Sequence, residues 1–319
     1  MKKTLVFIAS CLIVLTTSNK ATAQYYFLND NYYYNDFTYE LGASFGAINC
    51  MTDLGGKPGV GGKFTKDFII GTTHSNFGAY FNVTYKGIVG ARLEATFGNV
   101  SASDDQLSGV NFPDIAVARK DRNLSFQSEI NEYALIAEFH PLNAFINWRE
   151  KDMDPPRFSP YLMAGVGYFS FNPQTTNNAG DVVDLQPLHT EGQGFSEYPD
   201  RKEYSLSQVC YPVGLGVLYE ISPMIKVRAE FAYRFLDTDY LDDVSTNYID
   251  PSLFNKYLSA RDLNNAQQLN NRDLGYNYVG DPANAPYVPG RKRGDPTNND
   301  SYFTFNLKVG IMLGAQRIN

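Results

Sequence analysis

The sequence is poor in the residue types on which most enzymes and metal centres depend. It contains three histidines, three cysteines and one tryptophan among 319 residues. The histidines His74, His140 and His189 have no metal-ligand spacing to one another or to a cysteine. No serine motif of a hydrolase accompanies them. We therefore expect a protein that is not an enzyme and that has no catalytic residues, no metal site and no cofactor.

The sequence also lacks an excess of positive charge and, beyond its first residues, any long apolar run. Its net charge is −7, and this becomes −10 once the three lysines of the first 23 residues are removed. Nucleic acid attracts clustered basic charge, so a nucleic-acid partner is not expected. No later stretch approaches the roughly 18 uninterrupted apolar residues of a transmembrane helix. A chain of this composition can still sit in a membrane as a β-barrel, in which only alternate residues face lipid.

The first 23 residues have the layout of a signal peptide. Two lysines precede an apolar run from Leu5 to Leu15, and Ala21–Ala23 supplies the small residues of a cleavage site. We expect Gln24 to be the mature N-terminus. The apolar run is too short to span a membrane as a helix. An alternative is a lipoprotein box at Ile8–Cys11, but cleavage there would leave four apolar residues directly after the cut.

The clearest period in the chain lies between Tyr302 and Gly314. Apolar residues alternate there with Thr304, Asn306 and Lys308, so one face of an extended strand is wholly apolar. A run of about eleven residues at about 3.4 Å each spans roughly 37 Å. Strands of soluble proteins usually have about 5–6 residues. A longer strand, tilted by about 45°, matches the apolar band of an outer-membrane barrel.

The same alternation recurs in seven earlier stretches, which gives eight expected strands in all. They cover residues 38–48, 76–85, 89–97, 123–139, 161–171, 209–219, 225–235 and 302–314. Long connections follow the first, third, fifth and seventh strands, and shorter ones follow the others, beginning with a tight turn at Lys86-Gly87. This rhythm is typical of outer-membrane barrels, which have long loops outside and short turns in the periplasm.

The predicted fold is therefore all-β: an eight-stranded antiparallel transmembrane outer-membrane β-barrel with long extracellular loops, over residues 38–319. Residues 24–37, rich in tyrosine, asparagine and aspartate, are interpreted as a periplasmic lead-in segment. Both termini are expected in the periplasm. Two strands are harder to orient. The strand at 123–139 changes phase near Asn131, which indicates a bulge or a long, tilted strand, and the facing of 161–171 stays open.

The inward positions of these strands carry charges of both signs. An eight-stranded barrel is only wide enough for its side chains to fill it, and unpaired buried charge is costly. We therefore predict a plugged lumen with a salt-bridge network and no solute pore. The alternative, a proton or ion path, is disfavoured by the narrow barrel. The expected lumen network consists of Glu40, Arg92, Glu94, Glu129, Glu138, Arg228, Glu230, Arg234 and Lys308.

Two cysteines remain after cleavage, Cys50 and Cys210, and both lie near strand ends that we place on the same side of the membrane. Export permits a disulfide. The sequence leaves open whether the two cysteines pair.

An acidic run follows the seventh strand and includes Asp237, Asp239, Asp242 and Asp243. One interpretation is a Ca²⁺ site completed by loop carbonyls, but the run lacks the glycine and the terminal glutamate of an EF-hand loop. A solvated, hydrogen-bonded loop base is the favoured interpretation. Further on, Asp250-Pro251 has the pattern of an N-cap and a first helical residue, which predicts a short helix as far as about residue 260.

Four short motifs together resemble the PorG-like outer-membrane barrels of Bacteroidota. They are Tyr39–Gly42, Arg122–Phe126, Pro160-Tyr161 with Gly165–Gly167, and Thr238–Ser245, and they follow in order within residues 38–313. That family is similar to small eight-stranded barrels. Its best-known member belongs to the type IX secretion apparatus, where it is associated with a periplasmic ring built from a lipoprotein and its partner subunit. The chain departs from the family in its very long last loop.

The resemblance implies a structural barrel that anchors a secretion assembly, with outer-membrane lipid and the periplasmic ring proteins as its partners. The partner surface is then expected in the periplasm, at residues 24–37 and 141–160. The second segment contains Trp148, Arg149 and Glu150, of which Trp148 is equally interpretable as a membrane-interface residue. Two alternatives stay open: a surface adhesin or receptor that uses the long loops, above all Asp237–Ser301, and a small-solute channel.

Overall fold

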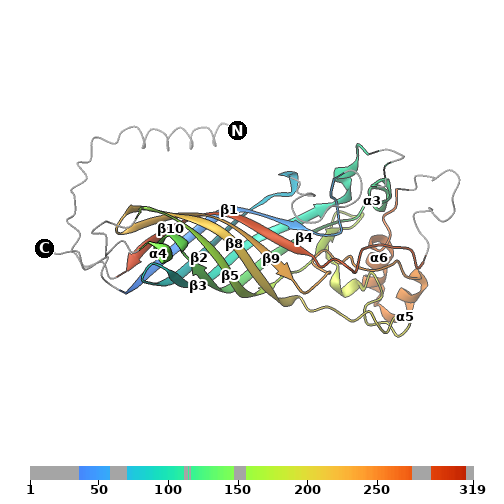
Figure 1. Ribbon diagram of the computed structural model, residues 1–319. Helices are drawn as coiled ribbons and strands as arrows, with labels where there is room; N and C mark the ends of the chain where they lie inside the picture. The colour runs from blue at the N-terminus through green and yellow to red at the C-terminus, as the bar shows by residue number, and fades with distance from the viewer. Residues whose placement is uncertain are drawn as a thin grey trace. The chain divides into compact units, whose positions relative to one another are not determined.

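The alternating stretches form eight long antiparallel strands in the computed structural model of the chain (Figure 1). Consecutive strands pair with one another, and the last pairs with the first, so the sheet closes on itself. The chain is thus a closed eight-stranded antiparallel barrel, which confirms the predicted fold. The barrel strands are β1 (Phe37–Met51), β2 (His74–Tyr85), β3 (Val89–Ser103), β4 (Ser125–Phe139), β5 (Phe158–Ser170), β8 (Ser207–Ser222), β9 (Ile225–Leu236) and β10 (Ser301–Leu313).

The structure describes residues 36–57, 70–110, 114, 116–146, 156–274 and 289–313. The predicted signal peptide at 1–23 and almost all of the lead-in segment at 24–37 lie outside these ranges. The candidate partner residues Trp148, Arg149 and Glu150 lie outside them as well. Within the described ranges, no helix combines the length and the apolar character that a membrane crossing requires.

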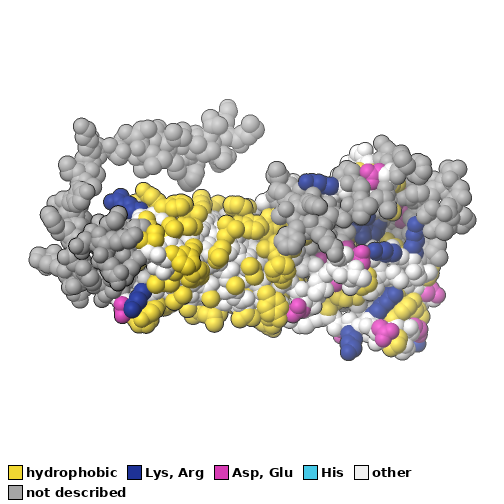
Figure 2. Space-filling view, viewed as in Figure 1, with side chains coloured by type: hydrophobic (Ala, Val, Ile, Leu, Met, Phe, Trp, Pro, Cys, Tyr) yellow, Lys and Arg dark blue, Asp and Glu magenta, His cyan; other side chains and the backbone are white. Residues whose placement is uncertain are grey.

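The outer face of the barrel is a belt of exposed apolar side chains (Figure 2). Across β1 and β10, Leu41 pairs with Ile311 and Phe45 with Leu307, and all four side chains are more than half exposed. An exposed apolar surface of this extent is unfavourable in water and is the surface that a barrel presents to lipid. The residues that alternate with a period of two in the sequence therefore have their apolar face on the outside of the barrel.

Short connections lie at one end of the barrel. Lys86 and Gly87 both have positive φ, and the Ile88 N–H donates to the Tyr85 carbonyl, which gives the expected tight turn. The β4–β5 connection contains the short helix α4 (Pro141–Phe145), and β8 and β9 are joined at residues 223–224. The long connections lie at the opposite end (Figure 1).

Strand β4 corrects one prediction. It pairs with β3 without any register shift, from Val89–Phe139 to Ser103–Ser125, so it is a long strand without a bulge. In an unbroken strand Glu129 is outward and exposed, and its assignment to the lumen was wrong. The phase was misread because Phe126 and Ile130 are apolar yet face inward. They belong to an apolar filling of the barrel end that local alternation does not reveal.

The long connections fold into a layer that we call the cap, formed by the described residues of 52–73, 104–124, 171–206 and 237–300. Its apolar residues are continuous with those inside the adjoining barrel end. The cap contains η2 (Ile70–Thr72), η3 (Asp104–Leu107), α3 (Val117–Arg122), β6 (Gln174–Thr176), β7 (Val182–Asp184), η5 (Gln186–Leu188), η6 (Pro251–Leu253), α5 (Phe254–Tyr257) and α6 (Ala260–Leu269).

One helical region of the cap was predicted, and the others were missed, of which α6 is the longest. Asp250 caps η6 by accepting from the Ser252 N–H, and η6 continues into α5, as the Asp-Pro pair indicated. Helix α6 lies in a stretch that was interpreted as loop. Its N-cap, Ser259, accepts from the Asp262 N–H, so a Ser-x-x-Asp pattern was the available signal.

Candidate functional site in the barrel lumen and the cap

The lumen at the short-connection end is held together by Arg228 of β9. Its guanidinium lies 2.7 Å from a Glu40 carboxylate oxygen on β1 and 2.9 Å from a Glu138 oxygen on β4. The Tyr80 hydroxyl donates to Glu40 over 2.5 Å, and Tyr161 donates to Glu230 over 2.8 Å. These side chains come from strands on different sides of the barrel and meet because each occupies an inward position of its strand.

Arg92 forms the centre of the network. Its guanidinium contacts three glutamates: Glu138, Glu94 at 2.8 Å and Glu230 at 2.8 Å. Lys308 from β10 closes the ring, since its Nζ lies 2.6 Å from Glu94 and 2.8 Å from Glu230. All of these side chains are buried. Each cation in this layer thus serves more than one carboxylate, which is the condition under which buried charge is tolerated.

The residues around Arg228 and those around Arg92 form two ionic layers of the lumen, and a third layer lies towards the cap. Arg234 contacts Glu132 at 3.0 Å and donates to the Thr304 hydroxyl over 2.5 Å. Tyr302 donates to the same Glu132 carboxylate over 3.0 Å. Glu132 was missed by the sequence reasoning that chose Glu129 in its place. The signal was its spacing of six residues from Glu138, since an even spacing keeps both on one face of an unbroken strand.

The structure thus places eight of the nine predicted lumen residues in the interior and Glu129 outside it. It adds Glu132 and the tyrosines 80, 161 and 302. The buried carboxylates Glu40, Glu94, Glu132, Glu138 and Glu230 face the cations Arg92, Arg228, Arg234 and Lys308. The half-buried Lys226 also interacts electrostatically with Glu40. The positive and negative charges of the network therefore nearly cancel. Its cations are bound to carboxylates and are not available to a ligand.

Beyond Arg234 the lumen is filled by apolar side chains. Ile48, Ile130 and Phe169 have no exposed surface, and they pack with cap residues such as Leu241 and Ile249. The ionic layers are therefore closed by an apolar plug at the end where the cap sits. No open path through the described part of the barrel is compatible with both fillings.

The filled lumen predicts that the barrel conducts no ions. The purified barrel reconstituted in a planar bilayer is expected to add no conductance, because ions would have to cross the apolar plug and displace fixed salt bridges. Single-channel recording at voltages of both signs measures this. Steps of constant size that scale with protein concentration would contradict the prediction.

One arrangement has the outline of a catalytic triad. His140 lies with Nδ1 3.1 Å from the Ser159 hydroxyl and Nε2 3.5 Å from a Glu138 oxygen. Both Ser159 and His140 are buried, and Glu138 is held by Arg92 and Arg228. A nucleophile has to be reached by its substrate, so this buried group is interpreted as part of the lumen filling at the short-connection end and not as a hydrolytic site.

The cap is joined by arginines that bridge loops. Arg122 contacts both oxygens of Asp104 over 2.8 Å and donates to the carbonyls of Asp53 and Arg293. Arg293 contacts Glu191 at 2.9 Å and donates to the carbonyl of Asp243. The buried bonds of Arg122 and Arg293 join four separate connections to one another. The cap is therefore a packed layer and not a set of independent loops.

The acidic run after β9 is mostly buried. Asp237 is exposed and accepts from the Tyr211 hydroxyl, whereas Asp239, Asp242 and Asp243 are buried. The expectation of a solvated loop base was therefore wrong for these three, because the cap folds over them. Asp243 accepts from the hydroxyls of Thr190 and Tyr204, and burial raises the pKa of its carboxyl to about 6.

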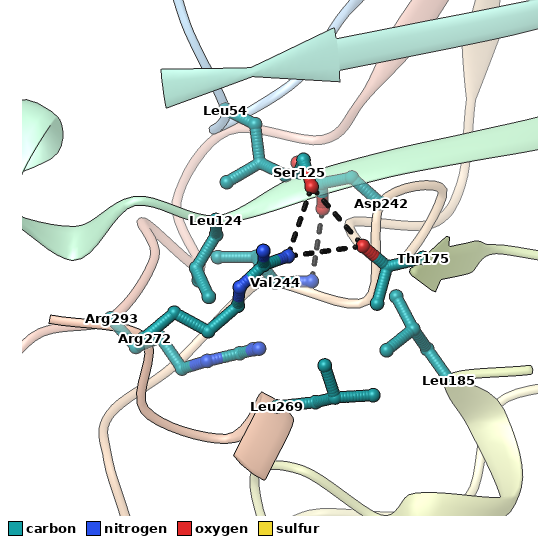
Figure 3. Close-up of a pocket in the computed structure, with 10 residues that line it drawn as sticks. All are labelled: Leu54, Leu124, Ser125, Thr175, Leu185, Asp242, Val244, Leu269, Arg272 and Arg293. Atoms are coloured by element: carbon teal, nitrogen blue, oxygen red, sulfur yellow. Dashed lines mark hydrogen bonds between the residues drawn. The ribbon is translucent and has the colours of Figure 1, made fainter. Parts of the chain in front are cut away.

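The cap also contains a small cavity under α6 (Figure 3). Arg272 lies across it and donates to the hydroxyls of Ser125 and Thr175 over 3.1 and 3.3 Å. Leucines form much of the wall, and Asp242 lines the cavity beside Ser125. The space has room for about one water molecule, so it does not accommodate an organic ligand.

The two cysteines, whose pairing the sequence left open, are free and buried. The Cys50 thiol lies 3.7 Å from the Ser101 carbonyl, and Cys210 lies 3.9 Å from the Tyr302 hydroxyl. The barrel therefore closes without a disulfide between them.

No protein-family model matches the chain, and no curated protein matches it. Several solved outer-membrane proteins are similar in structure. A major outer membrane protein from Thermus thermophilus is 11% identical, with 88% of this chain and 100% of that chain covered and a TM-score of 0.37. OprG from Pseudomonas aeruginosa is 12% identical, with 86% and 95% covered and a TM-score of 0.36. Ail of Yersinia pestis, solved with the heparin analogue sucrose octasulfate, is 9% identical, with 87% and 97% covered and a TM-score of 0.34.

Proposed function

We propose that this chain is a non-conducting outer-membrane barrel that serves as a structural anchor of a protein secretion apparatus of the type IX kind. The observation that carries the proposal is the double filling of the lumen, by salt bridges and by an apolar plug. A barrel closed in this way offers no passage and, in its described part, no accessible catalytic group. Its apolar belt provides the contact with outer-membrane lipid.

The type IX assignment draws on the resemblance of four ordered motifs to PorG-like barrels. In this proposal the cap lies outside the cell, and the short connections and both termini lie in the periplasm. The partners are then the periplasmic ring proteins, a lipoprotein and its partner subunit. The surface for them contains the expected segments at 24–37 and 141–160, including Trp148, Arg149 and Glu150.

Helix α4 is one described part of that surface. The Asn143 side chain donates to the Gly87 carbonyl over 2.8 Å, and the His140 N–H donates to the Ile88 carbonyl over 2.8 Å. These bonds hold α4 against the β2–β3 turn. Phe145 at its end is 83% exposed, the largest exposed fraction among the large apolar residues described. A fixed, exposed aromatic residue is a suitable anchor for a protein partner.

Co-purification from native membranes tests the proposal. The tagged full-length chain, extracted in mild detergent, is expected to recover the ring lipoprotein and its partner subunit. Phe145→Glu is expected to lower that recovery about tenfold, because a charge cannot enter an apolar contact. Val182→Glu in the cap is the matched control, since Val182 is also exposed. A barrel that is recovered alone, together with intact secretion in a deletion strain, would refute the anchor function.

The adhesin alternative is less well supported by the cap. Among the described cap residues, Val182 and Leu274 are the exposed large apolar side chains. Aromatic residues that dominate protein-binding surfaces, such as Phe195, Phe254 and Tyr204, are turned into the cap interior. The cap aromatics therefore stabilise the cap itself.

A further inference from the structure

Buried aspartates from separate segments lie within electrostatic range of one another where the cap joins the barrel. Asp239 and Asp242 follow β9, and Asp300 directly precedes β10. The exposed fractions of these residues are 8%, 1% and 3%. Asp53, which follows β1, lies close enough to act electrostatically on all three. The cluster therefore spans the ends of three neighbouring barrel strands.

These carboxyl groups have few partners. Both oxygens of Asp239 and the Oδ2 of Asp242 lack a hydrogen bond of good geometry among the described residues. The hydroxyls of Ser245 and Thr52 lie close to Asp239 and Asp242, but a hydroxyl carries no charge to balance a carboxylate. Asp242 accepts one backbone bond, from the Val244 N–H, and Asp300 accepts one, from the Leu241 N–H. An ionised carboxylate without a cation or several donors is strongly disfavoured in a buried site.

The neighbouring Arg122 does not neutralise the cluster. Arg122 acts electrostatically on Asp242 and Asp53, but its guanidinium is used by Asp104 and by the carbonyls of Asp53 and Arg293. Among the described residues, other titratable or charged groups around the cluster include Cys50, Glu191, Arg272, Lys292, Arg293 and Asp295. Of these, Arg293 is paired with Glu191, and Lys292 with Asp295.

A metal ion and protons are the two means of neutralising such a cluster. Among the described residues, no group of three or more histidine, cysteine, aspartate or glutamate side chains is arranged to hold a metal ion. Protons require no such convergence. Burial, followed by the repulsion of neighbouring carboxylates, raises the pKa of Asp239 to about 9 and that of Asp242 to about 8, and raises the pKa of Asp300 well above its usual range.

We propose that Asp239, Asp242 and Asp300 form a proton-held clamp, which fastens the cap to the barrel end while the three carboxyl groups are uncharged and loosens when they ionise. In an opened cap these groups are solvated and ionise near pH 3.9. In the closed cap they keep their protons to higher pH. The closed state is therefore most favoured below about pH 3.9, and its advantage declines as the pH rises towards 8–9.

This direction is opposite to that of most proteins, whose paired carboxylates make them less stable in acid. Each proton released on opening changes the opening equilibrium by about tenfold per pH unit. Hydrogen exchange of the full-length barrel in detergent, corrected for intrinsic exchange rates, measures this opening. Between pH 5 and pH 9 we expect protection of backbone amides 239–249 to fall by at least about tenfold, while protection of the barrel strands stays constant.

The variants separate the clamp from general effects of pH. Asp239→Asn together with Asp242→Asn keeps the size of both side chains without their titration, and we expect the pH dependence to become much weaker. Asp237→Asn is the matched control, because Asp237 is exposed and its loss should leave the profile unchanged. Retention of the heat-dependent gel shift of a folded barrel verifies each variant. If the double variant does not fold, the pH dependence of protection in the wild-type protein and in Asp300→Asn still tests the clamp, because Asp300→Asn is also expected to weaken that dependence.

Three results would overturn the clamp. The first is protection that stays constant or rises from pH 5 to pH 9. The second is a double variant with the slope of the wild-type protein. The third is full recovery of protection at pH 9 on adding micromolar Ca²⁺, which would identify a cation in place of protons.

Discussion

Arg92→Met is expected to lower the free energy of unfolding of the barrel by about 3–5 kcal/mol. The substitution removes the cation that contacts Glu94, Glu138 and Glu230, while methionine keeps most of the apolar stem. The penalty comes less from lost attraction than from three glutamates left partly uncompensated in a closed lumen. Urea titration in detergent, followed by the mobility shift of the folded barrel on unheated gels, measures it.

Lys202→Met is the matched control for Arg92, because Lys202 is an exposed cation in the cap. Its replacement should change the unfolding free energy by less than about 0.5 kcal/mol. Adding Glu138→Gln to Arg92→Met should recover part of the loss, since it removes one of the stranded charges. An Arg92→Met barrel as stable as the wild type would show that the lumen is hydrated and not filled.

Leu307→Arg is expected to destabilise the inserted barrel by about 2–4 kcal/mol. Leu307 lies in the middle of β10, pairs with Phe45 and Ala229, and is 63% exposed. Exposure of this kind predicts tolerance in a water-soluble protein, where surface substitutions usually have small effects. In a bilayer the same position faces hydrocarbon, and a guanidinium there loses its hydration.

Val182→Arg provides the comparison for Leu307, because Val182 is 57% exposed but lies in the cap. It should be neutral within about 0.5 kcal/mol. Each variant is folded into lipid vesicles at a series of urea concentrations, and its recovery in the membrane fraction is measured. This comparison distinguishes Leu307→Arg from Val182→Arg. Equal effects at the two positions would mean that the apolar belt does not meet lipid.

The period of two was sufficient to locate the barrel strands and to orient most of them. It succeeded for β1, β2, β3 and β10, where an apolar outer face alternates with glutamate, arginine, asparagine or lysine. It failed on β4, where the inward Phe126 and Ile130 are as apolar as the outward Tyr133 and Leu135. It left β5 open for the same reason, since Tyr161 and Met163 face inward beside an outward Leu162.

The number of strands and the lipid-facing surface could thus be derived from short stretches of sequence, because neighbouring residues of a strand face lipid and the barrel interior in turn. Folding alone determined which carboxylate meets which cation and whether the long connections would form a packed cap. Lys308 reaches Glu94 across 214 positions of sequence, and Arg122 reaches the Arg293 carbonyl across 171. Contacts between such distant positions leave no local period in the sequence, so they become visible only when barrel closure brings the strands together.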